Sequence, residues 1–380
     1  MSTIEENVKI REDLLDGKIP KRVFKQLTFT LEAACGLAGI DLKRAHYDVE
    51  LRNKAMHAVC ETFRSDSFPI ENIRFPEVYQ TLRAKNWVMS STGAMQHPEI
   101  ESFAAEDYED YIRDPYTTLV EKILPKIYGA LAGDRTTAYL SLLKAYSLRQ
   151  QAFGMLGAFE AEATQEFGYA PGFFVGGLAE APFDFLADQL RGFKATTIDV
   201  RRIPDTVERA VEATFPLMMK LALPRVIPKR YIVFMPLHLA PYLREKDFAR
   251  LWWPTFERVV VELHKLGIAA FLFAEVDWTR YADYLAKLPV GTIIKFEYGD
   301  AKLIKEKMGD RHIIGGFFDP TVTLTRSLDE CLDDVKRLLD IGMPGGRFYF
   351  AFNKHVIDIN SVDVKKLQAV CEYVHENAYY

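Results

Sequence analysis

The chain has 380 residues, of which 49% are hydrophobic and 27% are charged. These values are ordinary for globular proteins and exclude a disordered, collagen-like or coiled-coil chain. The net charge of −5 excludes the strongly basic surface of a nucleic-acid-binding protein.

The amino-terminal segment and the cysteines indicate a cytoplasmic protein. Residues 1–16 are charged throughout and contain no apolar core, so no secretory signal is expected. Apolar runs such as residues 268–274 are far shorter than the ~20 residues that a membrane-spanning helix needs. The cysteines form no C-x-x-C pair and lie far apart, which predicts reduced thiols. They are Cys35, Cys60, Cys331 and Cys371.

The first third of the chain, residues 1–132, is expected to be mostly helical, with a first strand near residues 22–29. Apolar residues recur at helical spacing over residues 41–63 and again over residues 108–131. Residues 64–101, between them, are rich in Pro, Ser and Asn and predict loops. We therefore expect a helical extension built onto the main domain.

From about residue 172 to residue 352, short apolar runs alternate with amphipathic stretches. Such continuous apolar runs, separated by helices, favour a parallel sheet that is covered on both faces. A last helix is expected within residues 353–380. The expected strands are residues 172–176, 195–200, 231–237, 268–274, 292–296, 312–317 and 347–352; the expected helices are residues 183–190, 204–221, 245–266, 278–287, 301–308 and 328–341.

Seven β/α units and the strand near residues 22–29 fit an α/β fold of the closed (β/α)8 TIM-barrel type, as a single domain over residues 1–380. A doubly wound sheet is the alternative. The sequence has no G-x-G-x-x-G after a strand and no G-x-x-x-x-G-K-[ST], so the signatures of dinucleotide and P-loop sites are missing. In a barrel, the active site would lie at the carboxyl ends of the strands.

The residues at the ends of four late strands suggest a candidate site. His238, Glu275, Glu297 and Asp319 each follow an apolar run. One imidazole and several carboxylates form a ligand set for a divalent metal such as zinc. The same groups are equally suited to general acid–base catalysis. Ordinary structural roles remain open, because a carboxylate after a strand often caps a helix, and Asp319 before a proline is typical of a turn.

Four further residues are candidates for substrate binding. Trp278 and Tyr281 follow Glu275 in the same loop and either line a pocket or pack in the core. Arg191, near Asp184, is able to bind a substrate carboxylate. The alternative for this second pair is a structural ion pair.

Several segments together resemble the uroporphyrinogen decarboxylase superfamily, which includes cobalamin-dependent methyltransferases. The resemblance runs from about residue 21 through nearly the whole chain and implies a (β/α)8 barrel. The segments that carry it are residues 106–115 (EDYEDYIRDP), 181–184 (APFD), 190–193 (LRGF), 199–204 (DVRRIP), 247–254 (DFARLWWP), 315–320 (GGFFDP) and 345–348 (GGRF).

Within the superfamily, the chain resembles the methyltransferase branch more than the decarboxylase. The decarboxylase grips its substrate with an arginine-rich amino-terminal segment, and residues 20–26 here lack that pattern. Thiol-methylating members hold zinc with a His-x-Cys and a later Cys, whereas here Glu275 ends the corresponding strand. Two alternatives then stay open: the metal is lost, or His238, Glu275 and Glu297 replace the thiolates and leave zinc a stronger Lewis acid.

These features predict a methyltransferase of the O-demethylase type, as found in anaerobic metabolism. It would move a methyl group from a small methoxylated substrate to a corrinoid (cobalamin), with Asp319 assisting. No D-x-H-x-x-G motif is found, so the corrinoid is expected on a separate partner protein. The family also suggests a homodimer. The alternatives are a metal-free decarboxylase or lyase that uses the same carboxylates for proton transfer, and a non-catalytic barrel subunit.

Overall fold

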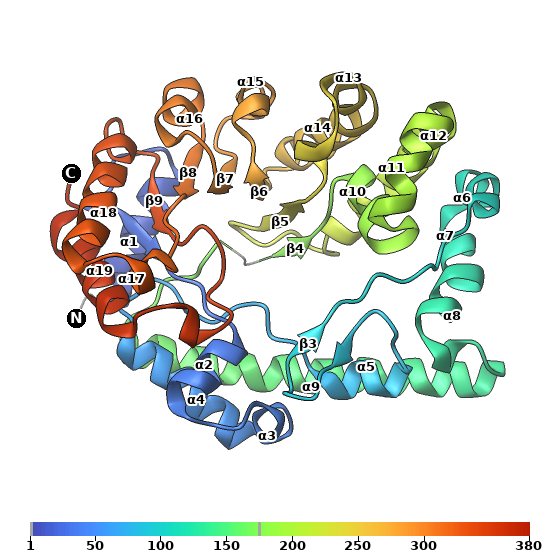
Figure 1. The fold of residues 1–380 in the computed structure, drawn as a ribbon, viewed down its shortest axis with the longest axis horizontal. Coiled ribbons are helices and arrows are strands. Elements are labelled where there is room, and N and C mark those ends of the chain that lie inside the picture. The colour runs from blue at the N-terminus through green and yellow to red at the C-terminus, as the bar shows by residue number, and fades with distance from the viewer. Residues whose placement is uncertain (1–2, 174–175) are drawn as a thin grey trace. The chain divides into compact units, whose positions relative to one another are not determined.

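The computed structural model describes residues 3–173 and 176–380 and is shown in Figure 1. Contacts divide the chain into two compact units. Unit 1 comprises residues 1–73, 155–175 and 271–380, and unit 2 comprises residues 74–154 and 176–270. The expectation of a single domain stays a prediction.

Unit 1 is built around parallel strands that neighbour one another in an order different from their order in the chain. Two of them, far apart in sequence, pair in parallel: β1 (Phe24–Gln26) and β9 (Tyr349–Ala351). Another parallel group follows chain order: β6 (Ala269–Asp277), β7 (Ile293–Tyr298) and β8 (Ile313–Gly316).

Single bridges join these groups into one arc. The bridge between Ile314 and Phe348 connects β8 to the start of β9. On the other side of β1, the N–H of Phe29 donates to the carbonyl of Pro69, so the segment that leads to residue 70 runs beside β1. The next segment joins through the N–H of Ala170, which donates to the carbonyl of Asp66. The parallel arrangement is thus confirmed, while closure into an eight-stranded barrel stays a prediction.

Helices lie before, between and after the strands of unit 1 in sequence, and each has buried residues. In α18, for example, Ser327 and Glu330 form a capping box, and residues at helical spacing such as Cys331, Val335 and Leu339 are buried. The helices are α1 (Ile4–Leu15), α2 (Leu31–Ala38), α3 (Leu42–Tyr47), α4 (Val49–Thr62), α15 (Ala282–Leu285), α16 (Ala301–Met308), α17 (Val322–Thr325), α18 (Leu328–Gly342) and α19 (Val364–Asn377).

Unit 2 contains a parallel pair, an antiparallel pair and many helices. Its strands are β4 (Gly177–Leu178) with β5 (Ile232–Leu237), and β2 (Val88–Met89) with β3 (Met95–Gln96). Its helices are α5 (Pro76–Leu82), α6 (Tyr108–Arg113), α7 (Pro115–Thr118), α8 (Leu124–Ile127), α10 (Pro182–Asp184), α11 (Phe193–Arg202), α12 (Pro204–Ala222), α13 (Glu245–Asp247) and α14 (Trp253–Lys265).

The sequence did not indicate one prominent element, the 33-residue helix α9 (Arg135–Phe167). Its residues up to Gly154 group with unit 2 and those from Met155 with unit 1.

Most predicted strands are confirmed, but the strand predicted at residues 195–200 is wrong. They lie in α11, where the hydroxyl of Thr196 donates to the carbonyl of Gly192 and that of Thr197 to Phe193. These bonds satisfy β-branched polar side chains inside a helix, so their strand preference does not decide the structure. The strand expected at residues 172–176 includes residues 174 and 175, which lie outside the described residues.

All four cysteines are buried in helices and none is disulfide-bonded, as expected. Burial raises the pKa of the thiols of Cys35, Cys60 and Cys371 to about 12. Among the described residues, no helix combines the length and the apolar character that crossing a membrane requires.

A buried ion pair connects β1 to the neighbouring segment. Arg22 and Asp66 are 1% and 2% exposed at their side chains and form two bonds, of 2.6 and 2.8 Å. Asp66 also accepts a bond from the backbone N–H of Lys25, and Arg22 donates to Asn7 of α1. This pair therefore holds together α1, β1 and the segment that carries residue 66.

We expect Asp66→Asn to lower the free energy of unfolding by about 3–5 kcal/mol, because the variant leaves the buried guanidinium without its countercharge. Urea unfolding of the full chain measures this change. The control is Asp333→Asn, which removes an exposed partner of Lys336 and should leave the midpoint unchanged. Equal midpoints for Asp66→Asn and wild type would show that the pair is not needed.

Candidate functional site

A lysine lies in the middle of the apolar strand β7. Lys295 is 4% exposed and lies between Phe273 of β6 and Gly315 of β8 in the strand register. Its Nζ is 4.8 Å from the centre of the Phe273 ring. Among the residues that the structure describes, Lys295 has no hydrogen bond and no ion pair within 4 Å.

The charge of Lys295 is balanced by carboxylates at a distance rather than by direct contact. Burial lowers the pKa of Lys295 to about 8, while the charges of Glu71, Glu275 and Glu297 act to raise it. Because residues alternate along a strand, Lys295 and Glu297 share one face of β7. Unit 1 therefore gathers one buried ammonium and three carboxylates around the carboxyl ends of β6 and β7.

Glu297 is held in place by two donors. Its Oε2 accepts a 2.8 Å bond from the backbone N–H of Val276, and its Oε1 accepts a 3.1 Å bond from Nζ of Lys354. Lys354 also donates to the hydroxyl of Tyr298 at 3.1 Å. Val276 has a φ of 64°, which is strained for a β-branched residue. Glu297 therefore stabilises an unusual backbone turn at the end of β6.

Glu71 approaches Lys295 from a different part of the chain. Its Oε1 accepts a 3.1 Å bond from Nε2 of Gln26 on β1, and its Oε2 lies 3.3 Å from Nε2 of His355. Burial and, to a smaller extent, the charge of Glu71 raise the pKa of Tyr349, whose hydroxyl has no hydrogen-bond partner among the described residues. A buried phenol without a partner is a donor that a ligand would satisfy.

The Tyr349 ring occupies space that a glycine leaves open. A Cβ added to Gly315 of β8 would lie 2.4 Å from that ring. Any larger residue at position 315 would therefore displace Tyr349.

In unit 2, the fully buried Asp184 organises the end of β5. Its Oδ2 accepts a 2.8 Å bond from the backbone N–H of His238, and its Oδ1 accepts a 2.7 Å bond from Nε1 of Trp252. Burial raises the pKa of Asp184 to about 6, and the charge of His238 opposes this shift. Both oxygens are committed to protein donors, so Asp184 positions the His238 segment.

Glu180, just after β4, is a second unusual acid in unit 2. Burial and the charge of Asp188 raise its pKa to about 8, whereas His238 acts to lower it. Gln189 donates to Oε1 at 3.1 Å, and Oε2 is buried without a hydrogen-bond partner among the described residues. Glu180 is thus a neutral acid at pH 7, with one oxygen available to a ligand.

The remaining predicted residues have structural partners. Arg191 donates to Asp199 at 2.7 Å rather than to Asp184, and Asp319 accepts bonds from Thr321 in a turn. Trp278 is 0% exposed and donates to the carbonyl of Glu275 at 2.8 Å, and Tyr281 packs against it. Contact of Asp184, Arg191, Trp278 and Tyr281 with a substrate stays a prediction, as does the assisting role of Asp319.

The positions of the candidate ligands decide whether the protein could hold the zinc ion that the sequence indicates. Throughout residues 3–173 and 176–380, no three His, Cys, Asp or Glu side chains are grouped so that they could hold a metal ion. Both oxygens of Glu297 already accept bonds, and Glu275 lies in the field of the Lys295 ammonium. The residues of unit 1 therefore do not fit a zinc site, and His238 belongs to unit 2.

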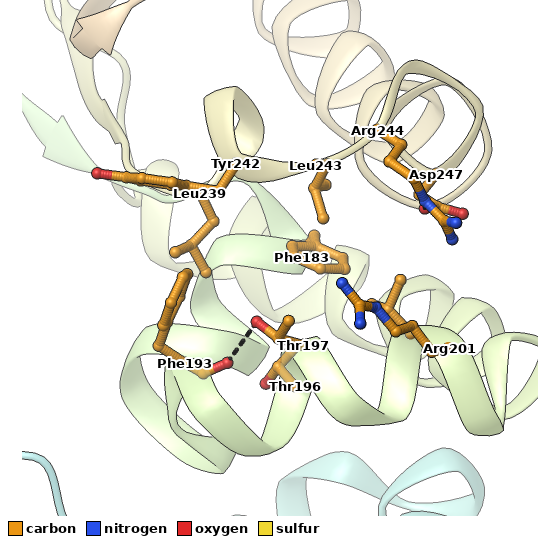
Figure 2. A pocket seen from close by; sticks show the side chains of 11 residues that line it. Phe183, Phe193, Thr196, Thr197, Arg201, Leu239, Tyr242, Leu243, Arg244 and Asp247 are labelled. Atoms are coloured by element: carbon orange, nitrogen blue, oxygen red, sulfur yellow. Dashed lines mark hydrogen bonds and ion pairs between the residues drawn. The ribbon is translucent and has the colours of Figure 1, made fainter.

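A small cavity of about 80 Å³ lies within unit 2 (Figure 2). Its floor is the buried Phe183, and its rim includes Phe193 and Tyr242, whose rings meet edge to face at 5.6 Å. Arg244 on the rim donates to Asp247 at 2.7 Å. The volume is well below the ~300 Å³ of typical ligand pockets, so the cavity is no more than a side pocket.

Sequence reasoning missed Lys295, Glu71 and Glu180. A signal existed for Lys295, because a charge between Ile294 and Phe296 interrupts an otherwise apolar strand. Glu180 comes shortly after β4, just as Glu275 follows an apolar run. The rule that picks out carboxylates at strand ends therefore also pointed to Glu180. Glu71 lies in an irregular segment and carries no local signal.

No family model and no curated protein matches this chain. A solved structure does match: a methyltransferase from Methanosarcina mazei shares the fold, with a TM-score of 0.59, 15% sequence identity and coverage of 99% of both chains. The likeness extends over the full length of both proteins, and at this identity it shows the fold.

The substitution Glu180→Gln tests whether the carboxyl group of Glu180 is protonated at neutral pH. A glutamate whose folded pKa is about 8 binds more protons in the native than in the unfolded state between pH 4.5 and 8, so wild type loses stability as the pH rises through that range. The glutamine variant lacks this loss and should be more stable than wild type by roughly 2–4 kcal/mol above pH 8.

Urea unfolding at pH 5 and pH 9 measures this difference. The control is Glu262→Gln, at a glutamate paired with Lys265 on the surface, and it should show no pH-dependent difference from wild type. A constant difference between Glu180→Gln and wild type at both pH values would mean that Glu180 is ionised like an ordinary glutamate.

Proposed function

We propose that this protein is a methyltransferase that moves a methyl group from a small methoxylated compound to a corrinoid carried by a separate protein. The fold, which it shares over its full length with a methyltransferase, supports this proposal. Active sites of (β/α)-type folds lie at the carboxyl ends of the parallel strands, where Lys295 and its carboxylates gather. The buried, unpaired Lys295 is the observation on which the proposal rests.

Cleavage of the methoxy carbon–oxygen bond needs a proton on the leaving oxygen, and Lys295 is able to supply it. A corrinoid on the partner protein would supply the electron pair for the new bond to the methyl carbon. The carbon–oxygen bond of the methoxy group breaks, and its electron pair stays on the oxygen. The Lys295 ammonium donates its proton to that oxygen, so the leaving group departs as a neutral alcohol or phenol. Glu71, Glu275 and Glu297 keep Lys295 protonated near neutral pH.

Lys295 has the pKa that such an acid requires. A lysine with its ordinary pKa of 10.5 would be a weak proton donor at pH 7, and burial brings this one to about 8. The face of the adjacent Phe273 ring, whose centre lies 4.8 Å from Nζ, accepts the cation. The side chains that surround Lys295 thus favour a protonated group that releases its proton readily.

Zinc held by His238, Glu275 and Glu297 takes no part in this scheme. The sequence-based prediction of that metal is tested by metal analysis of the purified protein. About one zinc per chain, reduced in Glu275→Gln and in Glu297→Gln, would support metal assistance.

A metal-free decarboxylase or lyase is the second candidate. It is favoured by the same buried ammonium, because a cationic acid beside carboxylates is suited to protonating a carbanion after loss of CO2. Product analysis separates the two candidates: methyl transfer consumes a methoxylated substrate together with cob(I)alamin, whereas decarboxylation releases CO2 without an acceptor.

We expect methyl transfer from a methoxylated substrate to cob(I)alamin to slow above about pH 8, because Lys295 then loses its proton. Lys295→Met should lower kcat by roughly 10²–10⁴-fold. Lys295→Arg keeps the charge and the fold but holds its proton too tightly to donate it, so kcat should fall while substrate binding remains. The pH profile of kcat/KM on all three proteins is the measurement.

The matched control is Lys305→Met. Lys305 of α16 also has a pKa lowered by burial to about 8, but its Nζ donates to the carbonyl of Gly346, away from the carboxylate cluster. This variant should keep the wild-type rate and pH profile. A normal rate in Lys295→Arg would show that Lys295 donates no proton.

A further inference from the structure

One row of residues crosses four neighbouring strands of unit 1 at a single level. The strand register places Phe273 of β6 beside Lys295 of β7, and Lys295 beside Gly315 of β8. A bridge between the preceding residues of β8 and β9 then puts Gly315 beside Tyr349. Side chains at paired positions of neighbouring strands point to the same face of a sheet. Lys295 and Tyr349 therefore share one face, with the glycine between them.

This row contains two buried hydrogen-bond donors that the protein itself does not use. Tyr349 is 0% exposed, and its hydroxyl makes no hydrogen bond with any described residue. Lys295 is buried as well and has neither a hydrogen bond nor an ion pair within the described part of the chain. Buried polar groups are almost always hydrogen-bonded in proteins. Two donors without partners in one row therefore indicate groups that a ligand satisfies.

The two donors lean in opposite directions. Nζ of Lys295 lies 4.8 Å from the centre of the Phe273 ring, on the side of β6. The Tyr349 ring instead fills the space at Gly315, where Cζ, the atom that carries the hydroxyl, would lie 2.4 Å from an added Cβ. Because neighbouring strands are about 4.8 Å apart, the donors are separated by roughly one to two strand spacings. They suit two different oxygens of a ligand rather than one.

The charges at this level disfavour an anionic partner for the Tyr349 hydroxyl. The oxygens of Glu71 already contact Gln26 and His355, and carboxylates outnumber ammonium groups around the site even with Lys354 bonded to Glu297. A ligand carboxylate would be repelled there, whereas an ether or hydroxyl oxygen would not. Solvent reaches this level at Glu71 and His355, whose side chains are 22% and 20% exposed.

We propose that the hydroxyl of Tyr349 donates a hydrogen bond to a second, uncharged oxygen of the substrate, while the methoxy oxygen lies at Lys295. Tyr349 is thus a specificity-determining residue, and the site selects methoxylated compounds whose second oxygen lies across the molecule, such as 4-methoxyphenol. The placement of the methoxy oxygen rests on the proposed function, whereas the two unused donors are a property of the structure alone.

Isothermal titration calorimetry with two probes of the same shape isolates the Tyr349 hydroxyl. The probes are 4-methoxyphenol and 4-methoxytoluene, in which a methyl group replaces the second oxygen. Wild type should bind 4-methoxyphenol roughly three- to tenfold more tightly, the effect of one uncharged hydrogen bond. Tyr349→Phe keeps the ring at Gly315 but lacks the donor, so it should bind both probes equally or prefer 4-methoxytoluene. A wild type without the preference, or a preference that survives in Tyr349→Phe, would overturn the proposal.

Thermal unfolding of the ligand-free variant separates binding from a structural role. Loss of a buried hydroxyl that has no partner should not destabilise the protein, so the Tm of Tyr349→Phe should equal or exceed that of wild type. A lower Tm would mean that the hydroxyl is bonded within the protein and would count against the proposal. The control is Tyr169→Phe, at a buried tyrosine of unit 1 whose hydroxyl lies beside the thiol of Cys60, and it should keep the wild-type preference.

A third probe, 4-methoxybenzoate, tests whether the second oxygen must be uncharged. It should bind to wild type at least about tenfold more weakly than 4-methoxyphenol at pH 7, because its carboxylate meets excess negative charge. Equal or tighter binding would overturn the assignment of an uncharged oxygen.

All of these binding measurements are made without a corrinoid, so they decide the role of Tyr349 whether or not methyl transfer occurs. A preference that depends on Tyr349, in a protein that transfers no methyl group, would refute the proposed function and support this inference. Methyl transfer from 4-methoxyphenol and 4-methoxytoluene at the same kcat/KM in wild type would support the proposed function and overturn this inference.

Discussion

An ammonium group inside an apolar strand constrains the structure around it. Lys295 is surrounded by β-strand residues, and transfer of its charge from water is unfavourable unless carboxylates lie nearby. Three segments supply them: the end of β6, the end of β7 and the irregular segment that contains Glu71. Two of the carboxylates are held by further contacts: Glu297 by Val276 and Lys354, and Glu71 by Gln26 and His355. The N–H of Val276, in the strained turn of β6, is one of the two donors that hold Glu297 beside that charge.

The two units solve the problem of buried charge differently. Unit 1 surrounds a cation with anions and keeps it protonated, whereas unit 2 buries Glu180 without a direct cationic partner and leaves it neutral. Asp184 lies between these cases, because donors from His238 and Trp252 satisfy both of its oxygens.

Apolar runs made the positions of β5 to β9 predictable, because a strand buried on both faces requires such runs. The same rule fails for residues 195–200, because the hydroxyls of Thr196 and Thr197 donate to backbone carbonyls four residues earlier and so fit within a helix. Carboxylates at strand ends were also predictable, and Glu275 and Glu297 do lie near one buried charge. Glu71 was not, because more than two hundred residues separate it from Lys295 and no local pattern connects them. Helix α9 was missed because its buried stripe is narrow and made largely of alanine, which gives little periodic contrast.

The four cysteines have a practical consequence for experiments on this protein. A thiol reacts with maleimides, iodoacetamide and mild oxidants as its thiolate, and burial raises the pKa of all four. At neutral pH the native chain is therefore nearly inert toward such reagents. A cysteine introduced at an exposed position would react far faster than the native four, so spin labels or fluorophores can be attached at chosen sites while every natural cysteine is retained.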